Sequence, residues 1–362
     1  MRTKNFVVFL VCIICTSVYL CLFGSQRPTI ENIVSQTHKQ LNNLKSFKEN
    51  LIDGEEKTLE VDLKYLNLIG LKRPPPVKYY PADAWTNSSL PVIVTAVTYD
   101  EEFNAIGFVR NAQHFAPNHT VMVYNLGLGQ AELENVLRHC NHSRCVVVMF
   151  DLSQFPSHVD DNKLHAYRPL VIADAVIRAG VILYMDSDQR LTSGRLEVLQ
   201  AAAERGGGVV SWPTRYAAST LTHPKMFDFF RTTPDNFLFV PMVLSSRLLV
   251  QNTKLVQEKL LLPWVQCALT AECLAPVGSQ SSGCRFDKKP QYRYSGCHRY
   301  DNSALNLALA LAFNFDDSKY LYPGKESFFR QAKSSEEGSS ETSANLMGLS
   351  PNRNITPPDQ NS

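Results

Sequence analysis

The sequence predicts an α/β fold, with a mostly parallel sheet and flanking helices, for residues 90–325. Short apolar runs alternate with helical segments between residues 91 and 185, which is the pattern of successive β-α-β units. Crossovers of this kind require a parallel sheet with right-handed connections, buried on both faces. The chain has 362 residues, of which 44% are hydrophobic, so it can bury at least one sizeable core.

The expected elements follow one another in a regular order. We expect strands at residues 91–98, 119–124, 145–152 and 181–185. We expect helices at residues 101–115, 131–139 and 163–179, the last closed by Gly180, which suits a left-handed C-cap. Ligands of such sheets bind beyond the carboxyl ends of the strands, so the residues that follow the strands are candidates for chemistry.

An apolar segment near the N-terminus predicts a membrane anchor. Residues 6–23 carry no formal charge and follow Arg2 and Lys4. Their length is at the lower limit for spanning ~30 Å of hydrocarbon. The positive-inside rule keeps residues 1–5 in the cytosol and sends the rest to the lumen, as in a single-pass type II protein. A signal peptide cleaved near Gly24 is the alternative.

Two further segments differ from the α/β part. Residues 24–89 are predicted to be a lumenal stem that pairs with a second copy of the chain, because apolar residues recur there at heptad spacing. The apolar residues are Ile30, Val34, Leu41, Leu44 and Leu51. Residues 74–76, all proline, stiffen the end of this stem into a linker. Residues 326–362 are predicted to be a disordered tail, rich in Ser, Glu, Asn and Pro from residue 334.

Cysteine usage is consistent with a lumenal domain. Three of the nine cysteines lie in the apolar N-terminal segment, and the other six form an even set that suits disulfides in an oxidising compartment. Pairing of neighbours in the sequence predicts three bonds: Cys140–Cys145, Cys267–Cys273 and Cys284–Cys297. A zinc site is the alternative, although these six cysteines form no C-x-x-C motif.

Charge and sequons add two expectations. The formal net charge is +2, from 36 basic and 34 acidic residues, which argues against duplex nucleic acid as a partner. N-x-S/T sequons can be glycosylated only in the secretory lumen. The chain has four of them, at Asn87, Asn118, Asn141 and Asn354.

Two acidic residues follow the fourth expected strand directly. In VILYMDSDQRL, Asp186 and Asp188 are separated by one residue, at the mouth of the sheet. Carboxylates so placed can converge on a hard divalent cation, Mn²⁺ or Mg²⁺. Such a cation would bridge the diphosphate of a nucleotide sugar and stabilise the leaving group. A solvated or capping turn is the alternative.

The stretch KLHAYRPLVIADAVIRAGVILYMDSDQR, residues 163–190, resembles the glycosyltransferases with a GT-A, nucleotide-diphospho-sugar transferase fold. In that fold a D-x-D motif follows a strand. The stretches HAYRPLVIADA, PWVQCALTAECLAPVGS and SGCHRYDNSALNLAL are similar to an animal family of type II membrane proteins of unassigned activity. The resemblance covers about residues 90–315. It implies a glycosyltransferase-like domain without naming its substrates.

The segment CHRYDN, residues 297–302, looks like the D-Q/N-x-x-L-N segment near the end of some retaining GT-A enzymes. This resemblance implies that Asp301 lies near the sugars, where it would orient an acceptor hydroxyl or act as a general base. An N-cap of the following helix is the alternative role for Asp301. His298 is the candidate third metal ligand, and a surface or hydrogen-bonded histidine is the alternative.

Five more residues are candidates for binding the donor. Lys163 or Arg168 would neutralise its diphosphate, unless both lie on a solvated helix face. Tyr99 and Asp100 end the first expected strand, where GT-A folds usually hold the base and ribose. Tyr99 would stack on uracil or, alternatively, pack in the core. Trp212 would line the sugar site, because aromatic faces pack against the apolar faces of sugars.

These features together predict a Golgi membrane protein with a lumenal catalytic domain. The expected activity is metal-assisted transfer of a sugar from a nucleotide-sugar donor to a glycan or glycoprotein acceptor. The expected cofactor is Mn²⁺ or Mg²⁺, and the expected oligomer is a homodimer paired through the stem. A catalytically silent GT-A-like lumenal binding protein is the alternative.

Overall fold

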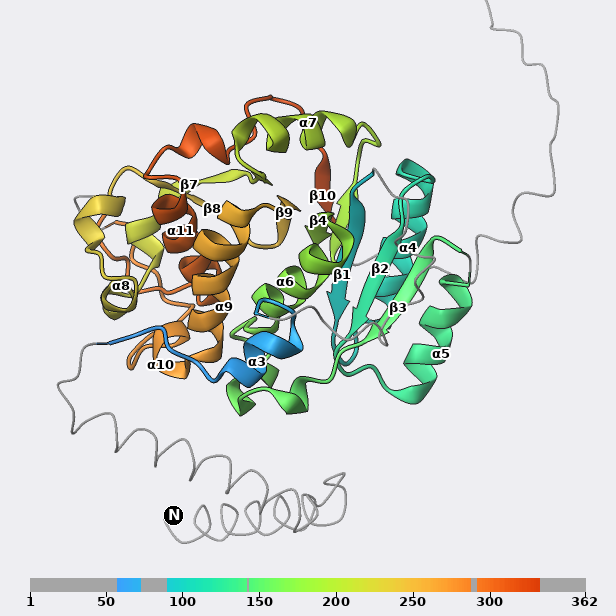
Figure 1. The fold of residues 1–362 in the computed structure, drawn as a ribbon, viewed down its shortest axis with the longest axis horizontal. Helices are drawn as coiled ribbons and strands as arrows, with labels where there is room; N and C mark the ends of the chain where they lie inside the picture. The colour runs from blue at the N-terminus through green and yellow to red at the C-terminus, as the bar shows by residue number, and fades with distance from the viewer. Residues whose placement is uncertain (1–56, 73–89, 142, 288–291, 333–362) are drawn as a thin grey trace, which may run out of the picture. The chain divides into compact units, whose positions relative to one another are not determined.

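A six-stranded sheet with the strand order β3-β2-β1-β4-β9-β6 forms the centre of the protein (Figure 1). The computed structural model describes residues 57–72, 90–141, 143–287 and 292–332. The strands are β1 Val92–Val97, β2 Val121–Asn125, β3 Cys145–Met149, β4 Val181–Met185, β6 Val209–Val210 and β9 Arg247–Gln251. The first four are parallel, β9 is antiparallel to β4, and β6 is antiparallel to β9. The predicted α/β class with a mostly parallel sheet is confirmed.

Three helices connect the parallel strands. They are α4 Glu102–Phe115, α5 Gln130–His139 and α6 Tyr167–Ala179. The first two agree with the sequence prediction to within one residue. The third begins at Tyr167 and not at residue 163, because the backbone N–H of Lys163 donates to the side chain of Asp161 at 3.0 Å and forms a turn there. Gly180 ends α6 in the predicted left-handed conformation, with φ +79°.

Both faces of the sheet are buried, as parallel strands with crossover helices require. Along β1, Val92 and Val94 belong to the apolar cluster that contains α6 and α9, Leu262–Leu269. Ile93 and Val97 belong to a second cluster, which contains α4 and α7, Glu197–Gly206. The period of two along the strand therefore divides the core into two layers.

The chain after β4 forms shorter elements, several of them antiparallel. Besides α7 and α9, its helices are α8 Pro224–Phe229, α10 Ala271–Leu274 and α11 Asp301–Ala312, with a π-helix at Val256–Leu261. The 3₁₀ turns of the domain are Leu152–Gln154, Ser157–Asp160, Ala218–Leu221, Pro234–Phe237 and Asp317–Lys319. Strand β5 Gln189–Leu191 pairs with β10 Phe329–Gln331, and β7 Pro213–Ala217 pairs with β8 Pro241–Val243.

The folded unit extends beyond both predicted ends of the domain. Helix α3, Leu63–Leu68, brings Leu66 and Ile69 into the same apolar cluster as α6, so residues 57–72 are part of the core and not of a separate stem. Strand β10 extends the fold past residue 325. The predicted anchor 6–23, the rest of the stem and the tail from residue 333 lie outside the described residues. Among the helices that are described, none is long and apolar enough to cross a membrane.

The three predicted disulfides are confirmed. They are Cys140–Cys145, Cys267–Cys273 and Cys284–Cys297. All six cysteines outside residues 6–23 are thereby paired, so the zinc alternative is wrong. Of the four sequons, Asn118 and Asn141 are exposed on the domain. Asn87 and Asn354 lie outside the described residues.

Candidate functional site at the carboxyl end of the sheet

The strand order reverses between β1 and β4. The chain builds β1, β2 and β3 outward in one direction and then returns through α6, so that β4 pairs with the other side of β1. Loops that leave the carboxyl ends of β1 and β4 therefore run in opposite directions, and a crevice for ligands forms at such a switch point. The residues that follow these strands, 98–101 and 186–188, lie at this switch point.

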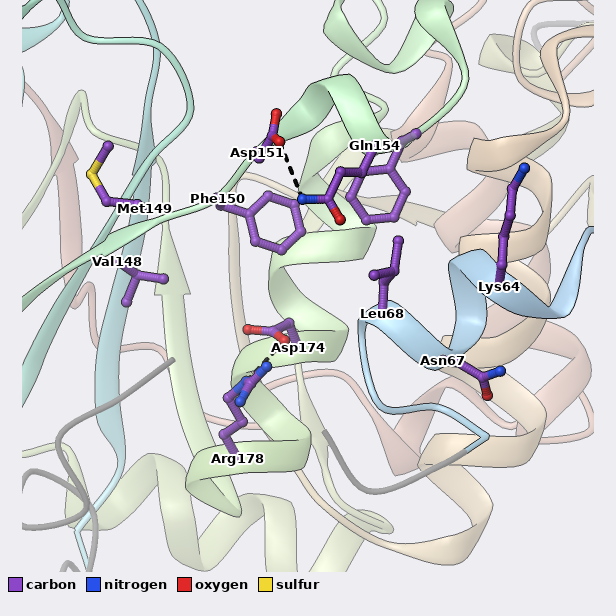
Figure 2. Close-up of a pocket in the computed structure, with 11 residues that line it drawn as sticks. Lys64, Asn67, Leu68, Val148, Met149, Phe150, Asp151, Gln154, Asp174 and Arg178 are labelled. Atoms are coloured by element: carbon purple, nitrogen blue, oxygen red, sulfur yellow. Dashed lines mark hydrogen bonds and ion pairs between the residues drawn. The ribbon is translucent and has the colours of Figure 1, made fainter. Parts of the chain in front are cut away.

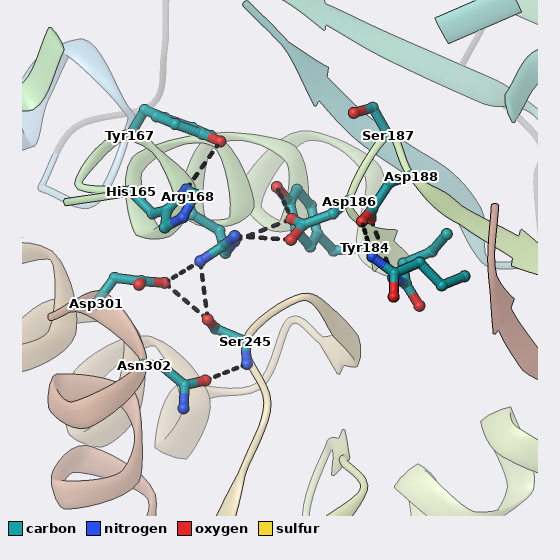
Figure 3. Close-up of polar contacts among 12 residues, drawn as sticks. His165, Tyr167, Arg168, Tyr184, Asp186, Ser187, Asp188, Ser245, Asp301 and Asn302 are labelled. Atoms are coloured by element: carbon teal, nitrogen blue, oxygen red, sulfur yellow. Dashed lines mark hydrogen bonds and ion pairs between the residues drawn. The ribbon is translucent and has the colours of Figure 1, made fainter. Parts of the chain in front are cut away.

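Arg168 joins two carboxylates that are far apart in the sequence (Figure 3). Its Nε and Nη2 donate to Oδ1 and Oδ2 of Asp186 at 3.1 and 2.7 Å, which is the two-pronged arrangement that guanidinium groups favour. Its Nη1 donates to Oδ2 of Asp301 at 2.5 Å and to Oγ of Ser245 at 3.0 Å. We call these four residues the Arg168 cluster. Helix α6, the end of β4 and the start of α11 thus meet at one cation.

The Arg168 cluster is buried. Arg168 is 4% exposed and Asp301 is 1% exposed, so the alternative that Arg168 lies on a solvated helix face is wrong. Burial disfavours the charge of Arg168, but the carboxylates of Asp186 and Asp301 raise its pKa above the ordinary value. Because buried ions are stable only when paired, loss of one member would leave an uncompensated charge, at a cost of about 3–5 kcal/mol.

Neighbouring groups fix the orientation of Asp301. Oγ of Ser245 donates to Oδ2 of Asp301 at 2.7 Å, and the backbone N–H of Ser245 donates to Oδ1 of Asn302. The indole N–H of Trp264, fully buried in α9, donates to the backbone carbonyl of Asp301 at 2.9 Å. The N-cap position of α11 is Tyr300, and the carboxylate of Asp301 makes no capping bond. The N-cap alternative for Asp301 is therefore wrong.

The two carboxylates of the D-S-D motif have different partners. Asp186 faces Arg168 and also accepts a hydrogen bond from the Tyr184 hydroxyl at 3.0 Å. Asp188 accepts bonds from the side-chain amides of Gln189 and Gln331, at 3.0 and 2.9 Å. Figure 3 shows the carboxylate of Asp186 turned toward Arg168. The two carboxylates are therefore engaged by different side chains, a guanidinium and a hydroxyl for Asp186 and two amides for Asp188.

His298, the predicted third ligand, is placed in the core. It is fully buried, its Nδ1 accepts the backbone N–H of His223 at 3.1 Å, and its Nε2 donates to the Leu274 carbonyl at 2.8 Å. Burial lowers its pKa to about 4, so the ring is neutral. Since both nitrogens are engaged, the prediction that His298 binds a metal is wrong, and the hydrogen-bonded alternative is correct.

A divalent cation does not fit the predicted ligand set in this arrangement. Both oxygens of Asp186 already bind a guanidinium, and His298 has no free nitrogen. Across the described residues, no group of three or more His, Cys, Asp or Glu side chains is arranged to hold a metal ion. The expected Mn²⁺ or Mg²⁺ thus has no preformed site at Asp186, Asp188 and His298.

The other predicted residues lie in several environments. Tyr99 is 66% exposed, so the alternative of core packing is wrong, whereas stacking on a base stays a prediction. Asp100 is exposed and has a left-handed backbone, with φ 64°. Lys163 is exposed in the turn before α6 and does not join the Arg168 cluster. Trp212 packs edge-on against Phe329, with ring centroids 4.7 Å apart, in the second apolar cluster.

Sequence reasoning missed several residues at the switch point. Glu101 accepts bonds from Thr98 and, at 3.0 Å, from the hydroxyl of Ser187 in the D-S-D turn, so it links the ends of β1 and β4. Its position three residues beyond an apolar strand was a usable signal. Ser245 carried no such signal, because the loop before β9 has no motif. His165, whose ring approaches the Tyr167 hydroxyl at 3.3 Å, was also missed.

Three of the six non-glycine residues with positive φ in the described part of the chain lie around the same site. Asp100, His165 and Tyr300 have positive φ values of 64°, 51° and 45°, and each precedes a helix whose start faces the switch point. Non-glycine residues rarely adopt this conformation, and such residues are common at functional sites. Burial and the charge of Arg168 lower the pKa of His165, so its imidazole is held neutral beside the cluster.

A separate pocket of about 360 Å³ lies between α3, the end of β3 and α6 (Figure 2). Figure 2 shows Asp174 and Arg178 of α6 on one side of it and Lys64 of α3 on the other. Arg178 is already paired with Asp174 at 2.9 Å, and the Tyr124 hydroxyl donates to Asp174 at 2.6 Å. None of the predicted site residues lines this pocket, so it is distinct from the switch point.

One sequence family matches part of the chain. It is described as a protein of unknown function, DUF1647, and it matches residues 58–173, from the start of the folded unit to the middle of α6. No curated protein matches the chain.

Several solved glycosyltransferase structures are similar in fold at low sequence identity. The apo structure of the bifunctional glycosyltransferase WbbM is 10% identical, with a TM-score of 0.41 over 61% of this chain and 38% of that chain. Mouse xyloside xylosyltransferase 1 in its apo form is 9% identical, with a TM-score of 0.34 over 64% and 84%. The galactosyltransferase LgtC in complex with donor and acceptor sugar analogs is 14% identical, with a TM-score of 0.35 over 59% and 69%.

These structures are glycosyltransferases, the class that the sequence resembles. The chain covers well under two thirds of the length of WbbM. Each of these three TM-scores is below 0.5.

Proposed function

We propose that the protein is a glycosyltransferase that transfers a sugar from a nucleotide-sugar donor to a glycan or glycoprotein acceptor at the switch point. The observation that carries this proposal is the Arg168 cluster. It holds Asp186, at the end of β4, and Asp301, at the start of α11, on the two sides of one guanidinium. Chemistry at a crevice of an α/β sheet requires such convergence of polar groups from several elements.

In this proposal the carboxylates bind the reacting sugars. Arg168 and Ser245 both donate to Oδ2 of Asp301, and among the described residues none donates to Oδ1. Asp301 would accept a hydrogen bond from an acceptor hydroxyl through Oδ1 and assist its deprotonation. Arg168 is a positioning residue, because it acts through the two carboxylates that it holds. No step is assigned to a metal ion, because the oxygens of Asp186 and both nitrogens of His298 already have protein partners.

Around the base of the nucleotide, the exposed ring of Tyr99 is the candidate platform. It follows β1 at the same end of the sheet as Asp186, and its exposure leaves the ring face open for stacking.

We further propose that the protein is a single-pass type II protein of the Golgi membrane, with this domain in the lumen and a stem that pairs two copies. The three disulfides and the exposed sequons Asn118 and Asn141 support an oxidising, lumenal location.

The activity can be tested on the full-length chain. The chain is incubated with a panel of UDP- and GDP-sugars, and the release of free nucleotide is measured with and without acceptor glycans. We expect one donor to be turned over, and we expect Asp301→Asn to reduce its rate about 100-fold or more, as loss of a general base does. Asp235→Asn, a change of the same type at an exposed residue away from the site, is the matched control and should leave the rate unchanged.

Two results would count against transfer. If a nucleotide binds but no donor is consumed, the protein is a catalytically silent lumenal binding protein. If neither UDP nor GDP binds at all, the nucleotide-sugar proposal fails.

A further inference from the structure

The carboxylate of Asp186, in the turn that follows β4, is already paired with the guanidinium of Arg168 and is poorly placed to bind a second cation. The two oxygens of that carboxylate are already shared with Arg168 and Tyr184. Arg168 itself is 4% exposed and is balanced by two carboxylates, so it offers no net positive charge to an anion. A diphosphate that binds at the switch point must therefore be neutralised from elsewhere.

Arg247 is placed to do this. It is the first residue of β9 and pairs in register with Met185 of β4, one residue before the D-S-D motif, while the backbone N–H of Asp186 donates to the carbonyl of Ser246. Arg247 is half-buried, and its Nε is buried without a hydrogen-bond partner. Within the part of the chain that the structure describes, no carboxylate forms an ion pair with it. An uncompensated buried donor of this kind favours an acceptor supplied by a ligand.

A second unpartnered donor lies against the same aromatic ring. The guanidinium of Arg247 lies over the ring of Phe329 at 5.7 Å from its centroid, and the indole of Trp212 packs edge-on against that ring at 4.7 Å. The indole Nε1 of Trp212 is buried and has no hydrogen-bond partner. Gln331, two residues after Phe329 in β10, donates a hydrogen bond to Asp188, so Phe329 and its two neighbours adjoin the D-S-D turn. Burial lowers the pKa of Arg247, and a bound anion would offset that effect.

We propose that Arg247 and the indole N–H of Trp212 form an anion site that binds the phosphates of the nucleotide donor without a divalent cation. Arg247 supplies the positive charge, and Trp212 supplies a neutral donor that fixes the orientation of a phosphate oxygen. This inference rests on the proposed function for the identity of the anion, a nucleoside diphosphate. It predicts metal-independent binding by a chain that carries a D-x-D motif.

Calorimetry on the full-length chain tests this site. UDP, GDP and inorganic pyrophosphate are each titrated once in EDTA and once in MnCl₂. We expect pyrophosphate and one nucleotide to bind in EDTA, with less than about a threefold change in Kd when Mn²⁺ is present, because no cation is needed as a bridge.

Three variants localise the site. Arg247→Gln should weaken binding of pyrophosphate and nucleotide about tenfold or more, since it removes a charge-assisted bond. Trp212→Phe keeps an aromatic ring against Phe329 but removes the N–H donor, and it should weaken binding about three- to tenfold. Arg138→Gln, at an exposed arginine of α5, is the matched control and should leave Kd unchanged. Thermal unfolding confirms that each variant is folded, and Trp212→Phe provides a second measurement if Arg247→Gln unfolds.

The outcomes separate this inference from the proposed function. Nucleotide binding that appears only with Mn²⁺ overturns the inference and leaves the proposed function intact. Binding in EDTA that is unchanged in both Arg247→Gln and Trp212→Phe also overturns it. If pyrophosphate binds through Arg247 but neither nucleotide does, the anion site stands and the proposed function fails. If none of the three ligands binds, both fail.

Discussion

The chain before residue 186 and the chain after it are built in different ways. From β1 to β4, each strand is followed by a helix and then by a parallel neighbour, and the stability of this half comes from apolar residues on both faces of the sheet. After β4 the elements are shorter and partly antiparallel. They share the apolar cluster of α6, and buried polar groups form further links to the first half.

This difference separates the scaffold from the chemistry. The first half supplies Arg168 and Asp186, and Ser245 and Asp301 of the second half supply the other partners of Arg168. The first half thus supplies the edge of the sheet, and the second half supplies Asp301, the second carboxylate that pairs with Arg168. A substitution in the Arg168 cluster should therefore affect both halves at once.

The largest expected effect is the loss of this shared cation. Arg168→Met should lower the free energy of unfolding by about 3–5 kcal/mol, because Asp186 and Asp301 are left buried without a positive partner. Urea unfolding followed by circular dichroism measures the change. Arg138→Met, at an exposed position of α5, should change stability by less than about 0.5 kcal/mol.

A triple variant distinguishes charge pairing from packing. Adding Asp186→Asn and Asp301→Asn to Arg168→Met removes the unpaired charges and should restore part of the lost stability. If the triple variant is as unstable as the sum of the single changes predicts, the residues do not act as a cluster.

Disulfides offer a smaller contrast between the halves. Cys284–Cys297, in the second half, has a sequence separation of 13, and Cys140–Cys145, between α5 and β3, has a separation of 5. Loop entropy predicts a loss of about 3 kcal/mol for replacement of the first pair by serine and about 2 kcal/mol for the second. Midpoints of urea unfolding for the two double-serine variants test the order. Equal losses would show that the halves tolerate an open loop equally well.

The smallest expected effect is a pH dependence centred on His298. Its pKa is lowered from 6.5 to about 4 in the folded protein, so the unfolded state binds the proton more tightly. The stability from the neutral ring is complete above pH 6.5, and it is lost as the pH falls from 6.5 toward 4. At pH 5 the loss should be about 2 kcal/mol relative to pH 8.

Unfolding curves between pH 8 and pH 5 measure this loss. Burial also lowers the pKa of His119 and His158, so these residues add to the same trend. His298→Gln should be less stable at pH 8 but should show a pH dependence smaller by about 2 kcal/mol. An unchanged pH dependence in this variant would contradict the buried, neutral state of His298.

Much of the first half could be predicted from the sequence. Its strands and helices each have a local signature, because a run of β-branched residues or a period of 3.6 involves only neighbours in the chain. The disulfides followed from proximity in the sequence. The start of α6 was missed because the turn at Lys163 depends on one hydrogen bond to Asp161. The burial of Leu66 was missed because a short helix has no core of its own.

The candidate site was predicted in its residues but not in its contacts. Asp186, Arg168 and Asp301 were singled out one at a time, for a metal, a diphosphate and an acceptor. The structure instead pairs all three with one another. His298 was predicted to be a ligand because a neutral imidazole suits a divalent cation, whereas its ring is enclosed by residues of other elements, including His223 and Leu274.

The sequence by itself determined the class of fold, the succession of β1 to β4 along the chain, the three disulfides and the end of the sheet at which polar residues gather. Local periodicity and the geometry of crossovers are sufficient for these features. Only the tertiary structure decided that Arg168 is the cation between Asp186 and Asp301 and that Arg247 remains without a carboxylate partner among the described residues. The pairing of charges depends on distances between residues that are remote in the sequence, and those distances exist only in the folded chain.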